Sequence, residues 1–194
     1  MKPRERVLAT ASKLFYREGI RAVGVDRVAA EANVSKMTLY RHFATKDDLV
    51  VAVLEARDEP AQALLTMATS SGDTPRDRLL AGFRMLEPWF TSRSFRGCPF
   101  MNASLELADP GHPARAVARR HKTATRDQFS RLATEAGIAD PDDFADQLAL
   151  LFDGAIAQAQ MRDPILVARA ALAAATTLVD AASAPVRASH PHRG

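Results

Sequence analysis

Residues 25–43 of the chain read VDRVAAEANVSKMTLYRHF, and this stretch has the pattern of two short helices joined by a tight turn. We expect the first helix to run to Ala32 and the second from Lys36 to Phe43, with residues 33–35 as the turn. The pattern predicts a helix-turn-helix unit, because apolar residues recur where its two helices would face each other. These residues are Val28, Ala29, Val34, Leu39 and Phe43.

The outer face of the second helix carries side chains that suit DNA. With about 100° of rotation per residue, Leu39 marks the core side, so Met37 and Arg41 point away from the core. Thr38 and Tyr40 flank that outer face. A cation, two hydroxyl groups and an apolar tip fit the base edges and phosphates of a major groove. On pattern alone, a solvated amphipathic helix is the alternative.

The positive charge of the chain lies in its first quarter. The formal net charge is +3 and the sequence pI is about 9.3. Residues 1–55 hold ten basic and seven acidic side chains, whereas the basic and acidic side chains after residue 55 are equal in number. The excess therefore indicates phosphate contacts near the N-terminus. A solvated basic face would give the same charge count.

The rest of the chain also favours helices. Strand signals are weak, because β-branched runs are short and aromatic residues make up only 6% of the chain. Apolar periodicity and turn residues predict further helices over residues 7–18, 45–60, 74–90, 100–107, 113–136, 140–159 and 163–182. Pro60 is expected to kink or end its helix. The sequence predicts an all-α protein of about nine helices, divided into a domain over 1–47, a domain over 48–182 and a disordered tail over 183–194.

Several classes of protein are not expected. Cys98 is the only cysteine, so it forms no internal disulfide, and this fits a reducing cytoplasm. The charged N-terminus has no apolar segment of a signal peptide, and no stretch approaches the roughly 20 uncharged apolar residues of a membrane span. Glycine-rich phosphate loops, HExxH pairs and GxSxG elbows do not occur, and the five histidines are scattered. We therefore expect a cytoplasmic protein that is not an enzyme and has no membrane partner, metal or cofactor.

The run VGVDRVAAEANVSKMTLYRHFATKDDLV at residues 23–50 resembles the N-terminal domain of TetR-family transcriptional regulators. The resemblance covers about residues 4–52, including the end of the first helix at residues 15–19. It implies a sequence-specific DNA-binding regulator, namely a ligand-responsive repressor that binds a palindromic, double-stranded operator as a homodimer. A transcriptional activator, or a helical protein that binds a small molecule without operator activity, are the alternatives.

The resemblance also implies which residues meet DNA. They are Gly24, Val25, Lys36, Met37, Thr38, Tyr40, Arg41, His42 and Lys46. Two of them depart from the family pattern. Gly24 stands where a capping threonine or serine is usual, and it offers no hydroxyl group for a phosphate contact. Met37 stands where a small residue is more common.

For the second half of the chain the resemblance implies a pocket for a small, hydrophobic effector and a dimer formed by the last two helices. Aromatic and apolar residues with a few polar groups are typical of such a pocket, although core packing would use the same residues. The candidate pocket residues are Phe83, Leu86, Trp89, Phe90, Met101, Asn102, Leu105, His121, Phe129 and Phe152. The candidate dimer residues are Phe144, Leu148, Leu151, Ile156, Leu172, Ala175, Leu178 and Val179. These apolar stripes would alternatively be buried within their own subunit.

Overall fold

The structure, a computed structural model, describes residues 1–183, and these form helices and the turns between them. The helices are α1 (Pro3–Glu18), α2 (Val25–Glu31), α3 (Lys36–His42), α4 (Lys46–Thr69), α5 (Pro75–Arg84), α6 (Leu86–Phe90), α7 (Pro99–Glu106), α8 (Pro113–Glu135), α9 (Pro141–Gln158) and α10 (Pro164–Ser183). Residues 1–183 contain no strand, so the predicted all-α class is confirmed. Ser183 belongs to α10, and the rest of the predicted disordered tail lies outside the described residues.

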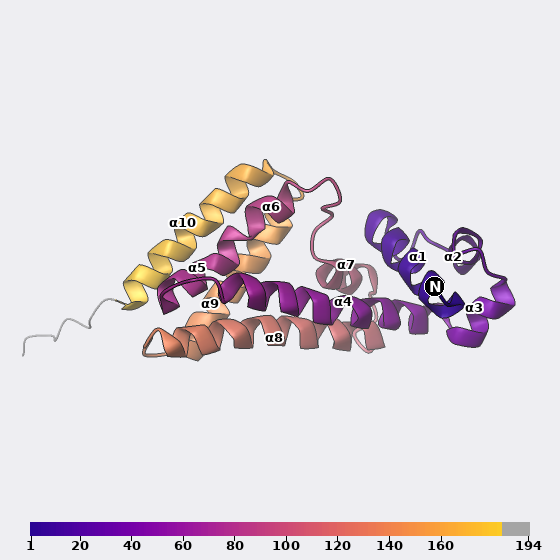
Figure 1. Ribbon diagram of the computed structural model, residues 1–194, viewed down its shortest axis with the longest axis horizontal. Helices are drawn as coiled ribbons and strands as arrows, with labels where there is room; N and C mark the ends of the chain where they lie inside the picture. Colours follow the sequence, from indigo (N-terminus) through magenta and orange to yellow (C-terminus); the bar gives the residue numbers. More distant parts are fainter. Residues whose placement is uncertain (184–194) are drawn as a thin grey trace, which may run out of the picture.

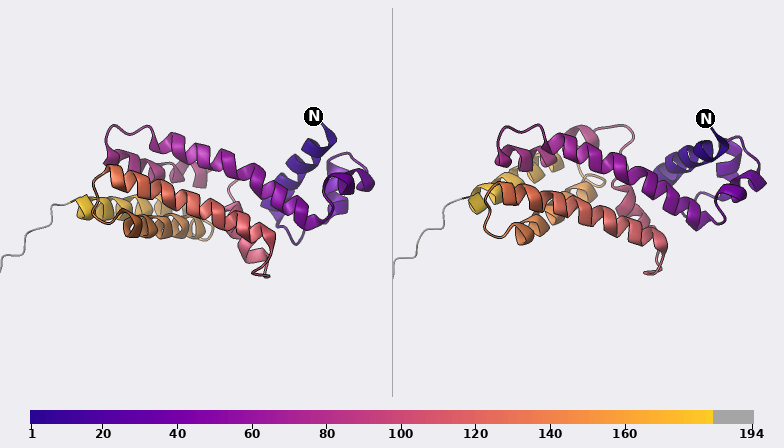
Figure 2. Two further views of the ribbon diagram at one scale, coloured as in Figure 1. Left: turned by 90° about the horizontal axis from the view of Figure 1, so that it is seen from below. Right: turned by 60° about the horizontal axis from the view of Figure 1, so that its bottom comes forward.

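The molecule is elongated, with α1–α3 at one end and α5, α6, α9 and α10 at the other (Figures 1 and 2). Helices α4 and α8 lie side by side and connect the two ends. They run in the same direction, because contacts between them advance together along both. Gln62 Nε2 lies 3.4 Å from Thr125 Oγ1, and one turn further on Thr66 Oγ1 lies 3.2 Å from Gln128 Oε1.

Proline marks where many of the helices begin. Its fixed φ and missing N–H suit the first helical position, where no intrahelical partner exists. The helices that begin with proline are α1, α5, α7, α8, α9 and α10. Side-chain caps add to this signal: the hydroxyl of Thr74 accepts the N–H of Asp77 at 3.1 Å at the start of α5.

Pro60 does not end its helix, because α4 continues to Thr69. The second half of α4 is held by its neighbour: Gln62 Nε2 donates to the carbonyl oxygen of His121 on α8 at 3.0 Å. Tertiary packing therefore stabilises a helix that the proline rule alone would terminate.

The predicted helix over 74–90 is two helices, α5 and α6, with Met85 between them. Pro88 explains the break, because it lacks the N–H that would bond to the Arg84 carbonyl, and its ring clashes with that carbonyl. Residues 1–183 therefore contain ten helices, where about nine were expected.

The core continues from the N-terminal helices into the rest of the chain. Leu14 and Leu39 are buried among α1–α3. Further along, three phenylalanine rings pack together, with centroids 5.7–5.9 Å apart. They are Phe83, Phe129 and Phe152, from α5, α8 and α9. Apolar burial of this kind is the main favourable contribution to folding.

By length and composition α10 is apolar enough to cross a membrane, with a mean hydropathy of 1.6 over 18 residues. It is not a run of uncharged residues, because Arg169 and Asp180 lie within it. The alanines between Ala168 and Ala182 raise the hydropathy. Helix α10 packs against α5, α6 and α9, yet only 28% of that window is buried. One apolar face of α10 is left uncovered.

Candidate nucleic-acid interface and internal cavity

The turn between α2 and α3 is fixed by local contacts. Asn33 adopts a left-handed conformation with φ of 52°, which asparagine tolerates better than most residues. Ser35 then caps α3, because its hydroxyl accepts the Thr38 N–H at 3.1 Å. Leu39 and Val28 are fully buried between the helices. The helix-turn-helix geometry follows from signals that lie within this short stretch.

The outer face of α3 is exposed, as the sequence predicts. Met37 is 82% exposed and Tyr40 is 40% exposed. Lys36, Arg41 and His42 are also exposed. The Thr38 side chain is half-buried, and its hydroxyl lies 2.8 Å from that of Ser35. Five of the predicted DNA contacts therefore share one solvent-facing surface.

The cations of this face differ in their partners. Lys36 Nζ lies 2.7 Å from Asp26 Oδ1, and this carboxylate raises the pKa of Lys36. Within residues 1–183, Arg41 has no salt-bridge partner. Arg41 therefore has its guanidinium donors available for a ligand.

Two helix starts lie beside α3. Lys46 is the first residue of α4, where Thr45 and Asp48 form a reciprocal cap: the Thr45 N–H donates to Asp48 Oδ2 at 2.9 Å. Gly24 caps α2, and Val25 is its first residue. A Cβ at Gly24 would meet nothing within 4 Å, and φ is −82°. Sterics therefore do not require glycine there, and the departure from the family pattern removes only a hydroxyl group.

An ionic cluster holds α1 against α2. Arg27 on α2 bonds to Glu18 at the end of α1 and to Glu31, the latter at 2.9 Å. Hydrogen bonds from Arg27 and Arg17 lower the pKa of Glu18 to about 2. Because the cluster is exposed, it contributes little to the free energy of unfolding, and its main effect is to fix the orientation of α1 relative to α2.

A cavity of about 420 Å³ lies among α4, α6, the start of α7, α8 and α9. Three of the predicted pocket residues line it: Trp89, His121 and Phe152. Arg57, Leu64, Met85 and Cys98 also line it, although none of them was predicted to. Arg57 and Leu64 share one face of α4, but no periodic pattern indicates that this face meets Met85 and Cys98.

The other predicted pocket residues lie elsewhere. Phe83, Leu86, Phe90 and Phe129 are buried core residues that do not line the cavity. Met101 and Leu105 border a separate surface hollow of about 300 Å³ between α7 and α8, where Leu105 is 83% exposed. Asn102 lies at the junction of α1, α4 and α7, and its Nδ2 donates to the Arg96 carbonyl oxygen at 2.7 Å.

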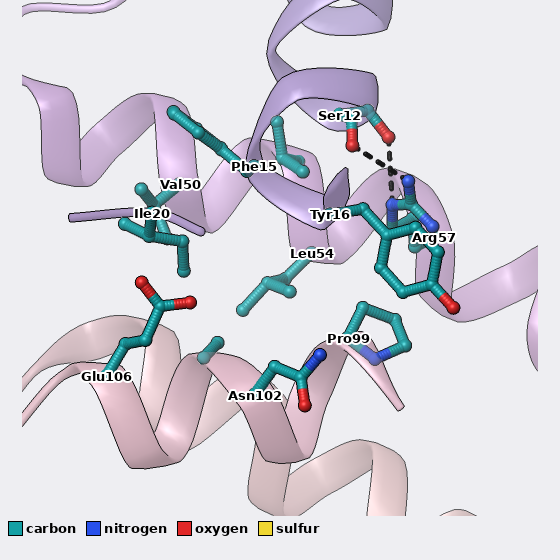
Figure 3. A pocket seen from close by; sticks show the side chains of 12 residues that line it. Ser12, Phe15, Tyr16, Ile20, Val50, Leu54, Arg57, Pro99, Asn102 and Glu106 are labelled. Atoms are coloured by element: carbon teal, nitrogen blue, oxygen red, sulfur yellow. Dashed lines mark hydrogen bonds between the residues drawn. The ribbon is translucent and has the colours of Figure 1, made fainter. Parts of the chain in front are cut away.

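Figure 3 shows that junction, where the side chains of α1, α4 and α7 leave only about 20 Å³. Arg57 of α4 donates to the hydroxyl and carbonyl oxygens of Ser12 on α1, both at 2.8 Å. Glu106 accepts the backbone N–H of Arg21 at 2.9 Å. The space holds about one water at most. The first helix is thus packed directly onto the helices that border the cavity.

A polar cluster forms one wall of the cavity. His121 Nδ1 lies 2.8 Å from Asp58 Oδ1, and the His121 ring stacks on Phe100 with centroids 3.7 Å apart. Burial lowers the pKa of His121, and the Asp58 hydrogen bond opposes this shift. The imidazole is therefore neutral at neutral pH and can hydrogen-bond to a ligand.

This burial predicts a pH dependence of stability. The ordinary pKa of histidine is 6.5 and the folded value is lower, so below that pH the unfolded chain binds a proton that the folded chain does not. The free energy of unfolding should fall as the pH drops, by at most about 1.4 kcal/mol per pH unit from this site. Denaturant titrations at about pH 7.5 and about pH 5.5 measure it. The loss should be smaller in His121→Gln and unchanged in the exposed control His42→Gln; equal losses in all three proteins would contradict the assignment.

The predicted dimer residues lie mostly inside their own subunit. Phe144, Leu148, Ile156, Ala175 and Val179 are buried, and Leu151, Leu172 and Leu178 are half-buried. Most of these side chains pack within the subunit, whereas other apolar side chains of α9 and α10 face solvent. The exposed apolar residues of this region are Leu150, Met161, Ile165, Leu166, Ala170, Ala173, Ala174 and Ala181.

Comparisons with known proteins identify the chain's relatives. Residues 7–53 match the family of bacterial regulatory proteins, tetR family. A TetR-family transcriptional regulator from Streptomyces coelicolor, SCO4454, is 37% identical, with 94% of this chain and 96% of that chain aligned at a TM-score of 0.88. The chain belongs to the TetR family. It is therefore a helix-turn-helix transcriptional regulator.

Two further TetR-family comparisons concern Escherichia coli K12 proteins. The HTH-type transcriptional regulator YjdC is 26% identical over 156 residues, covering 80% of this chain and 82% of YjdC. The HTH-type transcriptional repressor NemR is 30% identical over 116 residues, covering 59% of this chain and 58% of NemR. The family match spans the whole of α2 and α3 and includes all nine predicted DNA contacts.

Proposed function

We propose that this TetR-family regulator is a cytoplasmic, ligand-responsive repressor that binds a palindromic operator as a homodimer. The observation that carries the proposal is the exposed outer face of α3, where Arg41 is unpaired within residues 1–183 and Met37 is 82% exposed. The likeness to NemR, a repressor, supports repression. Residues 1–47 would form the DNA-binding domain and residues 48–182 the effector and dimerisation domain.

The proposed contacts with DNA divide into two kinds. Arg41 and Met37 would reach base edges in the major groove, since guanidinium groups bind guanine and apolar tips contact the thymine methyl. Lys46 and the N-terminus of α2 at Gly24 and Val25 would contact phosphates on either side of the groove. The remaining proposed contacts are Lys36, Thr38, Tyr40 and His42. Lys36 would exchange its bond with Asp26 for a phosphate.

A homodimer would place two α3 helices at the spacing that a palindromic operator requires. Two copies of α3 must reach major grooves about 34–36 Å apart, or a multiple of that distance. The uncovered apolar face of α10 supports such a dimer, because small side chains let two helices approach closely. We infer that the contact uses the exposed Leu166, Ala170 and Ala174 stripe, with Leu178 at its edge.

The cavity of about 420 Å³ would hold the effector. Its walls are mostly apolar, with the His121 cluster as a polar group, which is the usual character of a small-molecule site. The effector would favour a conformation in which the two α3 helices no longer match the groove spacing. A tenfold loss of operator affinity needs about 1.4 kcal/mol of coupling between the two sites.

The test is a titration of the purified protein against labelled DNA from upstream of its own gene, with an unrelated duplex as control. We expect site-selective binding that weakens steeply between about 50 and about 200 mM salt, because phosphate contacts release counterions. If neither this duplex nor a genome-wide selection yields a preferred site, the proposal fails and a helical small-molecule carrier becomes the better reading.

A further inference from the structure

A groove rich in cations lies beside the cavity, between α1 and the connection from α6 to α7. It has a volume of about 420 Å³. Five cationic side chains line it and no acidic side chain does: Lys13, Arg17, Arg57, Arg93 and Arg96. We call this hollow the basic groove.

The charges of the basic groove are poorly compensated within the chain. Among residues 1–183, Arg17 is the only one of the five that forms a salt bridge, with Glu18. Arg57 is half-buried and bonds only to neutral oxygens of Ser12, at 2.8 Å, while its guanidinium lies 4.8 Å from the centre of the Tyr16 ring. A partly desolvated cation without a carboxylate partner is unfavourable, so an anion bound here would be stabilised.

The basic groove and the apolar cavity adjoin. Tyr16, Arg57 and Ser94 line both of them. Beyond these residues the cavity is lined by aromatic rings, among them those of Trp89 and Phe152. A single ligand could therefore place an apolar body in the cavity and a charged head group in the groove.

We propose that the effector is an amphipathic organic anion, with its apolar part in the cavity and a carboxylate or phosphate head group in the basic groove. This inference rests on the proposed ligand-responsive function and specifies the chemistry of the ligand. Arg57, at the boundary of the two hollows, would meet the head group.

The position of the head group suggests how binding would reach the DNA-binding end. The Tyr16 hydroxyl of α1 donates to the Gly97 carbonyl oxygen at 2.8 Å and accepts the Arg96 N–H at 2.9 Å. These two bonds join α1 to the same connection that supplies Arg93 and Arg96 to the groove. An anion drawn between the two segments would change their spacing and so tilt α1, against which α2 and α3 pack.

The probes are decanoate and 1-decanol, which share a chain length and differ in the charge of the head group. Trp89 is the only tryptophan of the chain and lines the cavity, so its fluorescence reports binding. We expect decanoate to bind the protein at least about tenfold more tightly than 1-decanol, with decanoate below its micelle concentration and decanol below its solubility limit. Operator affinity is then measured in separate titrations, with and without each probe.

A pair of variants separates charge from packing. The double variant Arg93→Gln/Arg96→Gln should lose most of the preference for decanoate over decanol, because it removes two of the five cations and leaves Arg57 in place. Both side chains are exposed, so removing their charge leaves the fold intact. Arg131→Gln removes one exposed charge from α8, outside the basic groove, and should bind decanoate as the wild type does.

Three results would overturn the proposal. They are failure of decanoate to bind, equal affinity for the two probes, and an unchanged preference for decanoate in the double variant. Weaker operator binding by the double variant in the absence of probe would assign the groove to DNA phosphates and would also overturn it. Charge-dependent decanoate binding that leaves operator affinity unchanged would support the anion site and contradict the ligand-responsive function.

Discussion

Arg41→Ala should lose operator affinity by a factor of about 30 or more while the protein stays folded and dimeric. A bidentate arginine contact with a base edge is worth about 1–3 kcal/mol, and a palindromic site contains two such contacts, giving about 2–6 kcal/mol in all. Arg41 has no salt-bridge partner within residues 1–183, so replacing it removes no salt bridge from the folded protein. The loss should therefore appear in binding and not in thermal stability.

The measurement is an operator titration at fixed salt, repeated with an operator library and an unrelated duplex. A base-reading residue should relax sequence preference at one position of each half-site, whereas a phosphate contact would weaken all sequences alike. Arg131→Ala, an exposed arginine near the end of α8, is the matched control and should bind as the wild type does. Wild-type affinity in Arg41→Ala would remove Arg41 from the proposed DNA contacts.

The helix-turn-helix unit was predictable because its signals are local. The expected start of α3 at Lys36 is confirmed, since the cap at Ser35 and the turn at Asn33 both act within a few residues. Its buried side was also predictable, because a seven-residue helix with Leu39 as its buried residue allows few other orientations. Such short-range patterns need no knowledge of the rest of the chain.

Other boundaries depend on rules that compete. The helix does not end at Pro60, because packing of α4 against α8 stabilises the turns beyond it, whereas Pro88, at which no break was predicted, explains the break between α5 and α6. A single proline in a sequence does not show which outcome applies, because the deciding contacts come from residues far along the chain.

The cavity was the least predictable feature. The predicted pocket residues are largely aromatic, yet Phe83 and Phe129 pack against one another in the core and do not line the cavity. Arg57 lines both the cavity and the basic groove, and its place depends on a contact with Ser12, 45 residues away. No local pattern indicates that contact.

The dimer surface shows a related limit. Helix α10 is apolar on nearly all sides, so periodicity cannot tell its core-facing side from an interface. The predicted dimer residues of α10 include Ala175 and Val179, and both pack inward, whereas Ala170, Ala173 and Ala174 face solvent. Only the structure shows that one apolar stripe of α10 is not covered by the rest of the subunit.

Ala174→Arg should convert the protein to a monomer and weaken operator binding by about 10²–10⁴-fold, the gain that joining two binding modules usually provides. Ala174 is exposed on α10, and arginine is a good helix former, so the subunit itself should fold normally. A long charged side chain on a closely packed helix pair would separate the two subunits and bury a charge without a partner.

Light scattering measures the mass of the protein in solution, and circular dichroism measures its helix content. The operator titration measures its affinity for DNA. Ala63→Arg makes the same change at an exposed alanine of α4 and should leave both mass and affinity as in the wild type. A monomer that keeps full operator affinity would contradict the need for a dimer. A dimer with normal affinity would instead show that the subunits meet elsewhere. The combination of monomer, intact helix content and lost affinity is the outcome that the uncovered face of α10 predicts, because a single α3 can read only one half-site.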